Sequence, residues 1–352
     1  VANIANKGFS QRIVDAPFSP LGHNTTLSTK NATCVVLPTN QPINPPLNTG
    51  KLMRVVNQEQ PMHPIYNYAL VTDSIEGLVL FNVNTLVDGE LRNNFFKRAV
   101  TFNPANELSG ARHMILGGYY AYILTDKAMV VVNLNNPLNP KIVTRIAIKA
   151  PHSIALQFRY LFVTNEQGLS VIDITKPEEP RLVDNNTIAM KQAKRIHLAR
   201  TYAYVAAGKQ GIAIIDITNP EKLKLDQFFS ADGNIVDARD ITVAMTNASL
   251  FGYVADGVAG LKVVQLYAPD TQPKFYGFSP SPEPRLIAHY PTKSPALALS
   301  RGLERDRGVD ETGGQIAVFG RLGSRPLNFE EMKKLYLDTT GNPWFVKDKA
   351  DD

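Results

Sequence analysis

Polar residues that bind anions or exchange protons occur at the start of four apolar segments of this chain. The segments begin Ala111-Arg-His, Ala150-Pro-His, Ala193-Lys-Arg and Ala238-Arg-Asp. Guanidinium and ammonium groups bind anions, while imidazole and carboxyl groups serve as general acids and bases. Aligning the segments on their alanines predicts one cluster. Its polar groups either bind water and each other in a solvated channel, or bind a small anion or perform acid–base chemistry. Its members are Arg112, His113, His152, Lys194, Arg195, Arg239 and Asp240.

Repeated hairpins are the elements that must bring these residues together. Five stretches share an aromatic-led apolar strand, a short polar turn and a second strand rich in Val and Ile, and they begin at Tyr68, Tyr120, Tyr160, Tyr202 and Phe251. The turn glycines Gly77, Gly168, Gly211 and Gly260 can adopt a positive φ. Ala128 stands at this position in the second copy, so its turn should differ. We expect the recurring tyrosines to pack between neighbouring repeats, with their hydroxyl groups bonded locally, rather than to form a binding site.

The repeat length points to a β-propeller. The turn positions recur at intervals of roughly 40–50 residues, and a further strand precedes and follows each hairpin, which makes four short strands per repeat. A weaker sixth copy surrounds Gly314. We therefore expect an all-β propeller of six four-stranded blades, and five blades is the alternative. In such a ring the innermost strands begin at the central channel, so the predicted cluster would line the channel mouth.

The two ends of the chain fall outside the repeats. We expect residues 1–49 to form a non-repetitive N-terminal arm, residues 50–323 the propeller and residues 324–352 a C-terminal appendage. A strand at 50–57 would pair with the sixth repeat and close the ring, which removes an exposed sheet edge. In the appendage, residues 328–336 start with an N-cap asparagine and place apolar residues on one face, which predicts a short amphipathic helix.

A basic block lies within the fourth repeat. Residues 191–210 contain no acidic residue, and their cations are Lys191, Lys194, Arg195, Arg200 and Lys209. Such a block either spreads over a solvated surface or forms a docking patch for an anionic partner. The whole chain has a formal charge of only +5, and we expect no nucleic-acid partner.

Several kinds of chemistry have no support in the 352 residues. Cys34 is the single cysteine, which excludes an internal disulfide and covalently attached c-type haem. His113 and His152 lack a third ligand in the alignment, so no metal site is predicted. The chain has no hydrolase nucleophile elbow and no phosphate-binding glycine loop, and no apolar run reaches the ~18 residues of a membrane-spanning helix. We expect no enzyme activity and no covalently bound cofactor.

Copies three and four resemble a known repeat family. Gly168-LSVIDITKPEEP and Gly211-IAIIDITNP are similar to the LVIVD repeat of bacterial and archaeal surface proteins. The resemblance implies a β-propeller and an exported protein, located in the periplasm, on the cell surface or outside the cell, that binds a ligand or partner. Some members are associated with multi-haem cytochromes. The motif defines structure and assigns no catalytic residue, and we expect its Asp173 and Asp216 to accept backbone N–H groups rather than to bind calcium.

The repeats and the basic block together favour a non-enzymatic interaction scaffold. We expect an accessory partner of a multi-haem cytochrome or of another surface or extracellular assembly, with haem present only through the partner and the basic block facing exposed haem propionates. A propeller hydrolase or lyase is the first alternative, in which His113, His152 and Asp240 would be acid–base groups and Arg195 would stabilise an anion. A structural adhesion protein that forms homo-oligomers or filaments is the second.

Overall fold

The computed structural model describes residues 27–38, 63–83, 96–184, 186–246, 249–269, 271–273, 279–300, 321–322, 325–326 and 339–340. Within them the regular structure is β-strand, together with two short 3-10 turns, η2 (Pro64–Asn67) and η5 (Pro104–Asn106). The predicted all-β class is therefore confirmed. The predicted helix at 328–336 and the predicted closing strand at 50–57 lie outside the described residues.

The first repeat forms a four-stranded antiparallel sheet. Its strands, in order, are β1 (Ala32–Val36), β2 (Tyr68–Asp73), β3 (Gly77–Asn82) and β4 (Lys97–Phe102). β1 comes from the segment expected to be a non-repetitive arm. A long segment separates β1 from β2, whereas a tight turn joins the first two strands of the later repeats, and the repeat pattern therefore did not reveal β1.

Four more antiparallel sheets follow, each with its strands in chain order. The second contains β5 (His113–Gly117), β6 (Tyr120–Leu124), β7 (Ala128–Asn133) and β8 (Lys141–Ala147). The third contains β9 (Ser153–Gln157), β10 (Tyr160–Asn165), β11 (Gly168–Asp173), β12 (Arg181–Leu182) and β13 (Ile188–Ala189). The fourth contains β14 (Ile196–Ala199), β15 (Tyr202–Ala206), β16 (Ile212–Asp216) and β17 (Lys224–Phe229). The fifth contains β18 (Asp240–Thr246), β19 (Ser249–Ala255), β20 (Leu261–Tyr267) and β21 (Arg285–Tyr290).

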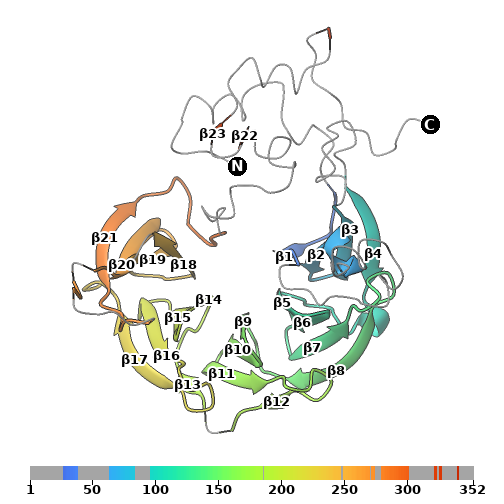
Figure 1. Ribbon diagram of the computed structural model, residues 1–352, viewed down its shortest axis with the longest axis horizontal. Helices are drawn as coiled ribbons and strands as arrows, with labels where there is room; N and C mark the ends of the chain where they lie inside the picture. Colours follow the sequence, from blue (N-terminus) through green and yellow to red (C-terminus); the bar gives the residue numbers. More distant parts are fainter. Residues whose placement is uncertain are drawn as a thin grey trace, which may run out of the picture. The chain divides into compact units, whose positions relative to one another are not determined.

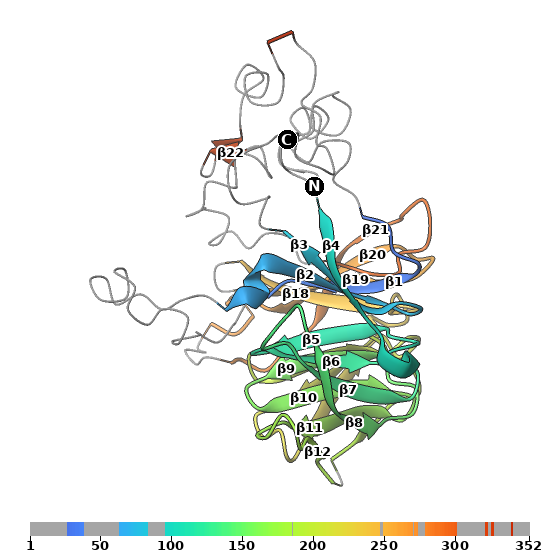
Figure 2. The same ribbon diagram turned by 90° about the vertical axis from the view of Figure 1, so that its right-hand side faces the viewer.

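The chain divides into two compact units. One holds residues 1–71, 78–102 and 302–352, and the other holds residues 72–77 and 103–301, which include the second to fifth sheets. A short hairpin in the first unit pairs β22 (Arg321–Leu322) with β23 (Arg325–Pro326). Figure 2 shows the second sheet from the side, with β5 to β8 following one another.

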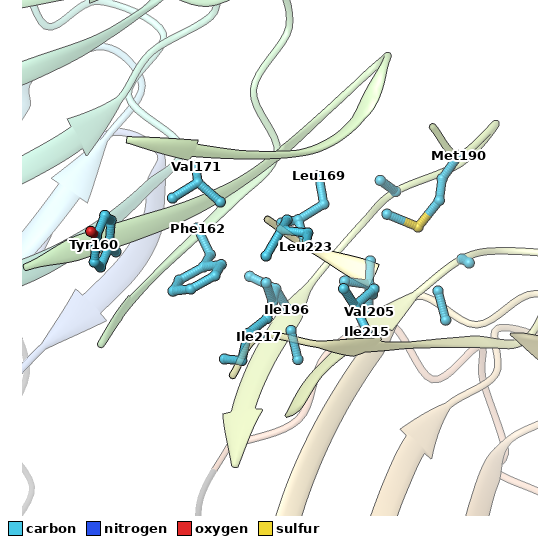
Figure 3. Packing of buried hydrophobic residues seen from close by; sticks show 14 residues of the cluster. Tyr160, Phe162, Leu169, Val171, Met190, Ile196, Val205, Ile215, Ile217 and Leu223 are labelled. Carbon is cyan, nitrogen blue, oxygen red and sulfur yellow. The ribbon is translucent and has the colours of Figure 1, made fainter. Parts of the chain in front are cut away.

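The second unit places the first strands of its sheets next to one another. β9 contacts both β5 and β14, and β14 contacts β18, on the inner side of the row of sheets in Figure 1. The middle strands of the third sheet are buried on both faces because neighbouring sheets cover them, and every residue of β10 and β11 is buried. Figure 3 shows one such interface, where Phe162 and Leu169 of the third sheet pack with Ile196 and Ile215 of the fourth.

Tight turns join the middle strands as predicted. The four turn glycines have φ values of 82° (Gly77), 133° (Gly168), 77° (Gly211) and 79° (Gly260). A side chain at Gly168 would meet the backbone as well, because a Cβ atom there would lie 1.9 Å from the carbonyl oxygen of Ile188. The turn before Ala128 closes without glycine, through a hydrogen bond from Thr125 N to the Ala128 carbonyl (2.8 Å), and thus differs as expected.

Candidate functional site

The second unit has two edges at which loops gather, a start face and a turn face. The start face is the edge at which β5, β9, β14 and β18 begin, and the turn face is the edge at which they end. Hydrogen bonds align these strands, because His152 before β9 bonds to Ala193 before β14, and the side chain of Gln157 at the end of β9 donates to the carbonyl of Arg200 after β14 (2.8 Å). All members of the predicted cluster lie at the start face.

Backbone hydrogen bonds identify the equivalent residues of successive repeats. Four N–H groups donate to the last or next-to-last carbonyl of the second strand: Arg112 to Leu124 (2.8 Å), His152 to Thr164 (2.8 Å), Lys194 to Ala206 (2.9 Å) and Arg239 to Ala255 (2.8 Å). We call Arg112, His152, Lys194 and Arg239 the rim set. The residues that follow them, His113, Ser153, Arg195 and Asp240, form the inner set.

This register corrects the alignment in the third repeat. His152 was aligned with His113, which is wrong by one residue, and Ser153 is the true equivalent of His113. Pro151 occupies the place that Ala111 and Ala193 hold in their repeats. Ala150 lies one residue earlier, in the left-handed conformation with a φ of 44°.

The cations of the rim set form ion pairs with carboxylates. Arg112 forms an ion pair with Asp126. Asp237 binds two cations, with Lys194 Nζ 2.7 Å from its Oδ1 and Arg239 Nε 2.6 Å from its Oδ2. Burial alone would raise the pKa of Asp237, but the hydrogen bonds from Lys194 and Arg239 hold it below its ordinary value. His152 instead donates from Nδ1 to the carbonyl of Ala193 (2.6 Å).

Most inner-set side chains accept a hydrogen bond from the next repeat. The acceptor atoms and donors are His113 Nδ1 from Ile154 N (3.0 Å), Ser153 Oγ from Ile196 N (3.4 Å) and Asp240 Oδ2 from Leu299 N (2.8 Å). Each donor lies one residue after an inner-set position. Leu299 fits this rule because Ala296 bridges to Gly257 as Ala238 bridges to Gly208. These side chains therefore join consecutive repeats at the start face.

The protonation of His113 and Asp240 follows from burial. Burial, with a smaller effect from the charge of Arg195, lowers the pKa of His113 from 6.5 to about 3, so the ring is neutral at neutral pH. Because Nδ1 accepts from a backbone N–H, the ring proton is on Nε2. Burial raises the pKa of Asp240, opposed by the N–H of Leu299, the charge of Arg195 and the N–H of Ile241. An imidazole with such a low pKa is a weak general base at neutral pH.

The basic block does not form one patch. Lys191, Lys194 and Lys209 lie at the start face, and Lys209 N donates to the side chain of Gln192 (3.2 Å). Arg200 follows the last residue of β14, at the turn face, because Ala199 pairs with Tyr202. The extended strand between Arg195 and Arg200 places them at opposite ends of the hairpin, which proximity in sequence conceals.

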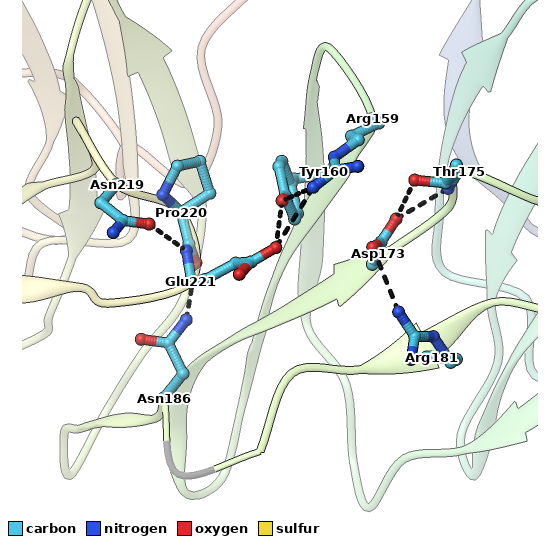
Figure 4. Close-up of polar contacts among 9 residues, drawn as sticks. All are labelled: Arg159, Tyr160, Asp173, Thr175, Arg181, Asn186, Asn219, Pro220 and Glu221. Carbon is cyan, nitrogen blue, oxygen red and sulfur yellow. Dashed lines mark hydrogen bonds and ion pairs between the residues drawn. The ribbon is translucent and has the colours of Figure 1, made fainter.

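In the second and third sheets the tyrosine that begins the second strand binds an acid of the following repeat, a contact that the sequence did not predict. Tyr120 donates to Glu178, and Tyr160 donates to Glu221 Oε1 (2.6 Å), so the tyrosines do lie between repeats but their hydroxyl partners are distant in sequence. Figure 4 shows Arg159 bonded to both Tyr160 (2.5 Å) and Glu221 (3.2 Å). The available signal was the Pro-Glu pair shared by the third and fourth repeats.

The outer strand of the third sheet provides another link to the fourth. β12 and β13 both pair with β11, at its opposite ends, and a short segment separates them. Asn186 in this segment donates to the carbonyl of Pro220 (2.6 Å; Figure 4). It also accepts from Leu223 N (2.7 Å), so both ends of its amide are used.

The motif aspartates act as turn caps. Asp173 accepts from Thr175 N (2.8 Å) and Thr175 Oγ1 (2.6 Å), and these bonds, with nearby Arg159 and Arg181, lower the pKa of Asp173. Asp216 accepts from Thr218 N (2.8 Å). The predicted turn role is thus confirmed. Among the described residues, no group of three His, Cys, Asp or Glu side chains could hold a metal ion, and no helix in that part of the chain is long and apolar enough to cross a membrane.

Comparison with known proteins supports the fold. Residues 151–187 and 191–228 match the LVIVD repeat. A functionally unknown protein from Desulfotomaculum acetoxidans DSM 771 has a similar structure, with 14% identity, a TM-score of 0.50, and coverage of 66% of this chain and 71% of its own. No curated protein sequence matches the chain.

Two further solved structures also align with the chain. The Myceliophteria thermophila Cps50 (Swd1) beta-propeller domain has 15% identity and a TM-score of 0.40, and the alignment covers 56% of this chain and 66% of that one. Kluyveromyces lactis Hsv2 has 13% identity and a TM-score of 0.37, with 56% and 57% covered. The matched repeats and the series of four-stranded antiparallel sheets support an LVIVD-repeat β-propeller protein.

Proposed function

We propose that the protein is a non-enzymatic, exported β-propeller that serves as a protein-interaction scaffold. The observation that carries this proposal is the use of the three acid–base candidates at the start face. His113, His152 and Asp240 each bond to the backbone of the following repeat. Groups engaged in holding repeats together support a rigid binding platform over a hydrolase or lyase that needs them for proton transfer.

The start face would receive an anionic partner. Three of its carboxylates, Asp126, Glu166 and Asp237, already form ion pairs. Four cations of the start face make no ion pair with a described residue, namely Lys127, Lys191, Arg195 and Lys209, and the three lysines are exposed. Cations without nearby counter-charges steer an acidic partner to a surface and set its orientation.

A multi-haem cytochrome is the partner that we propose, because the LVIVD family includes members associated with such proteins. Exposed haem propionates are carboxylates, which lysine and arginine side chains bind. The exported location belongs to the same proposal, as does the absence of a cofactor held by this chain itself.

Six blades with closure by the N-terminal segment are likewise proposed. The pairing of Ala296 with Gly257 supports a sixth repeat, because it repeats the pairing of Ala238 with Gly208 at the entry to the fifth sheet.

Purification without a tag from the natural source, followed by native mass spectrometry and visible absorption, tests the function. We expect a complex with a partner protein, and a Soret band identifies that partner as a haem protein. The double variant Lys191→Glu/Lys209→Glu should lose the complex, while Lys176→Glu, which lies in a turn-face loop with Glu179, should retain it. A lone chain, or equal loss in both variants, would contradict a scaffold that docks through its start face.

A further inference from the structure

One member of the inner set breaks the pattern that its equivalents follow. His113, Ser153 and Asp240 each accept the backbone N–H of the next repeat. Arg195 stands at the same position, and a guanidinium has no acceptor. The N–H that it would have received, that of Ile241, bonds to Asp240 Oδ1 (2.8 Å). The Arg195 side chain therefore does not make the hydrogen bond to the next repeat that its equivalents make.

Arg195 also differs from the other cations of the predicted cluster. Arg112, Lys194 and Arg239 have carboxylate partners. The half-buried side chain of Arg195 makes no hydrogen bond or ion pair with a described residue. A partly desolvated guanidinium is costly when it is unpaired, and departures from a structural rule concentrate at functional sites.

The groups around Arg195 limit what it can bind. Its charge lowers the pKa values of both His113 and Asp240, which places all three side chains in one electrostatic environment. Both oxygens of Asp240 accept backbone N–H groups, and His113 is neutral with its proton on Nε2. A nearby buried carboxylate favours a singly charged ligand over phosphate, which would bring more negative charge to the same place.

We propose that Arg195 anchors a carboxylate-binding site at the start face. The planar guanidinium pairs with a carboxylate through two parallel hydrogen bonds, and no other unpaired cation of the start face has this geometry, since the remaining ones in the described residues are lysines. This site deepens the proposed scaffold function and rests on it. The carboxylate comes either from a free small acid or from an aspartate or glutamate of the partner protein.

Two probes distinguish the sources. In the first arm, acetate is titrated into the full-length protein while the Arg195 Nε–H signal is followed by NMR. In the second arm, a peptide with one central aspartate and blocked ends is compared with its asparagine counterpart. We expect saturable binding of the aspartate peptide at least tenfold tighter than that of the asparagine peptide. Saturable acetate binding alone assigns the site to free acids, and absence of binding in both arms overturns the proposal.

Two variants separate a binding role from a structural one. Arg195→Ser restores the acceptor that Ser153 provides in the preceding repeat, so it should abolish carboxylate binding while raising the melting temperature. Arg239→Gln, at the rim, should bind within twofold of the unsubstituted protein. A lower melting temperature for Arg195→Ser, or equal loss of binding in both variants, overturns the assignment. If Lys191→Glu/Lys209→Glu loses the partner while neither acetate nor the aspartate peptide binds the unsubstituted protein, the scaffold function stands and the carboxylate site fails.

Discussion

At the residue scale, single side chains form the hydrogen bonds that join consecutive repeats. His113 is a titratable group used as a fixed acceptor, since its Nδ1 holds Ile154 N and burial keeps the ring neutral. Protonation would remove that acceptor and place a charge in a desolvated position, so the ring links stability to pH.

Stability should fall on mild acidification because of His113. The unfolded chain takes up the proton near pH 6.5 and the folded ring only near pH 3, so between these values the unfolded state binds more protons and is favoured as pH drops. We expect denaturant unfolding to give about 1.4 kcal/mol less stability at pH 5.5 than at 7.5 from this residue. His113→Gln keeps an acceptor and should lack this contribution, and an unchanged pH dependence in the variant would contradict the assignment.

Phe158 has a strained backbone conformation, and its side chain is almost fully exposed. It lies at the tip of the β9–β10 turn with a φ of 52°, and its side chain is 89% exposed. Gly118 occupies the same place in the preceding hairpin with a φ of 61°. Because a bulky residue is disfavoured in this conformation, Phe158→Gly should stabilise the protein by about 0.5–1 kcal/mol, measured by denaturant unfolding. Gly118→Phe is the reciprocal control and should destabilise it, whereas loss of stability in Phe158→Gly would mean that the ring packs in solution.

Prediction from the sequence was least complete for the positions and partners of single side chains. The types of the cluster residues were evident from the sequence. Pro151, however, occupies the alanine position in the third repeat, so Ser153 rather than His152 is the inner-set residue. A one-residue shift moves a side chain to the other face of a strand, so short segments that lack a repeated glycine or aromatic residue cannot be aligned by pattern alone. The partners Asp126 and Asp237 lie in loops, where no period identifies them.

At the element scale, each repeat contains one hairpin, and contacts with the neighbouring repeat hold that hairpin in place. The hairpins were predictable, because an aromatic start, a glycine turn and a Val/Ile-rich strand recur together. The division of the outer strand into β12 and β13 was not predictable, since the single predicted strand Pro180-RLVDNNTI does not indicate where pairing is interrupted. Asn186 in that interruption depends on a loop that lies 34 residues further along the chain.

The bond between Tyr160 and Glu221 should be measurable as an interaction between sheets. We expect a double-mutant cycle of Tyr160→Phe and Glu221→Gln to give a coupling free energy of about 1 kcal/mol by denaturant unfolding, limited by the exposure of the glutamate. Glu179→Gln removes a carboxylate from an exposed pair with Lys176 in the neighbouring loop and should show no coupling with Tyr160→Phe. A coupling near zero for Glu221 would mean that the hydroxyl group binds water instead.

At the scale of the whole molecule, the second unit is a row of sheets in which each contacts its immediate neighbours. The all-β class and the four strands per repeat followed from the repeat spacing, because the period is a property of the chain as a whole and survives local irregularities. The contribution of Ala32–Val36 to the first sheet did not follow, since that pairing joins segments separated by a long insertion.

Nearest-neighbour coupling predicts how far a disturbance spreads. Glu221→Gln should increase amide hydrogen exchange in β10 of the third sheet and in the loop before β17 of the fourth, because those are the segments that the bond joins. The strands β19 and β20 of the fifth sheet should keep their protection. Exchange measured by mass spectrometry that rose in all sheets alike would instead indicate a unit that opens as a whole.

Several links between repeats run in one direction along the chain. Thr164 donates to the carbonyl of Lys194, Lys194 binds Asp237, and Asn186 binds the loop at Pro220, so each side chain reaches toward the part of the chain that is made later. A growing chain thus presents every repeat before its partner exists, and each new repeat completes the one already made. Shortening the protein from its C-terminal side would strip partners from side chains that remain, while shortening it from the other side would remove the reaching groups themselves.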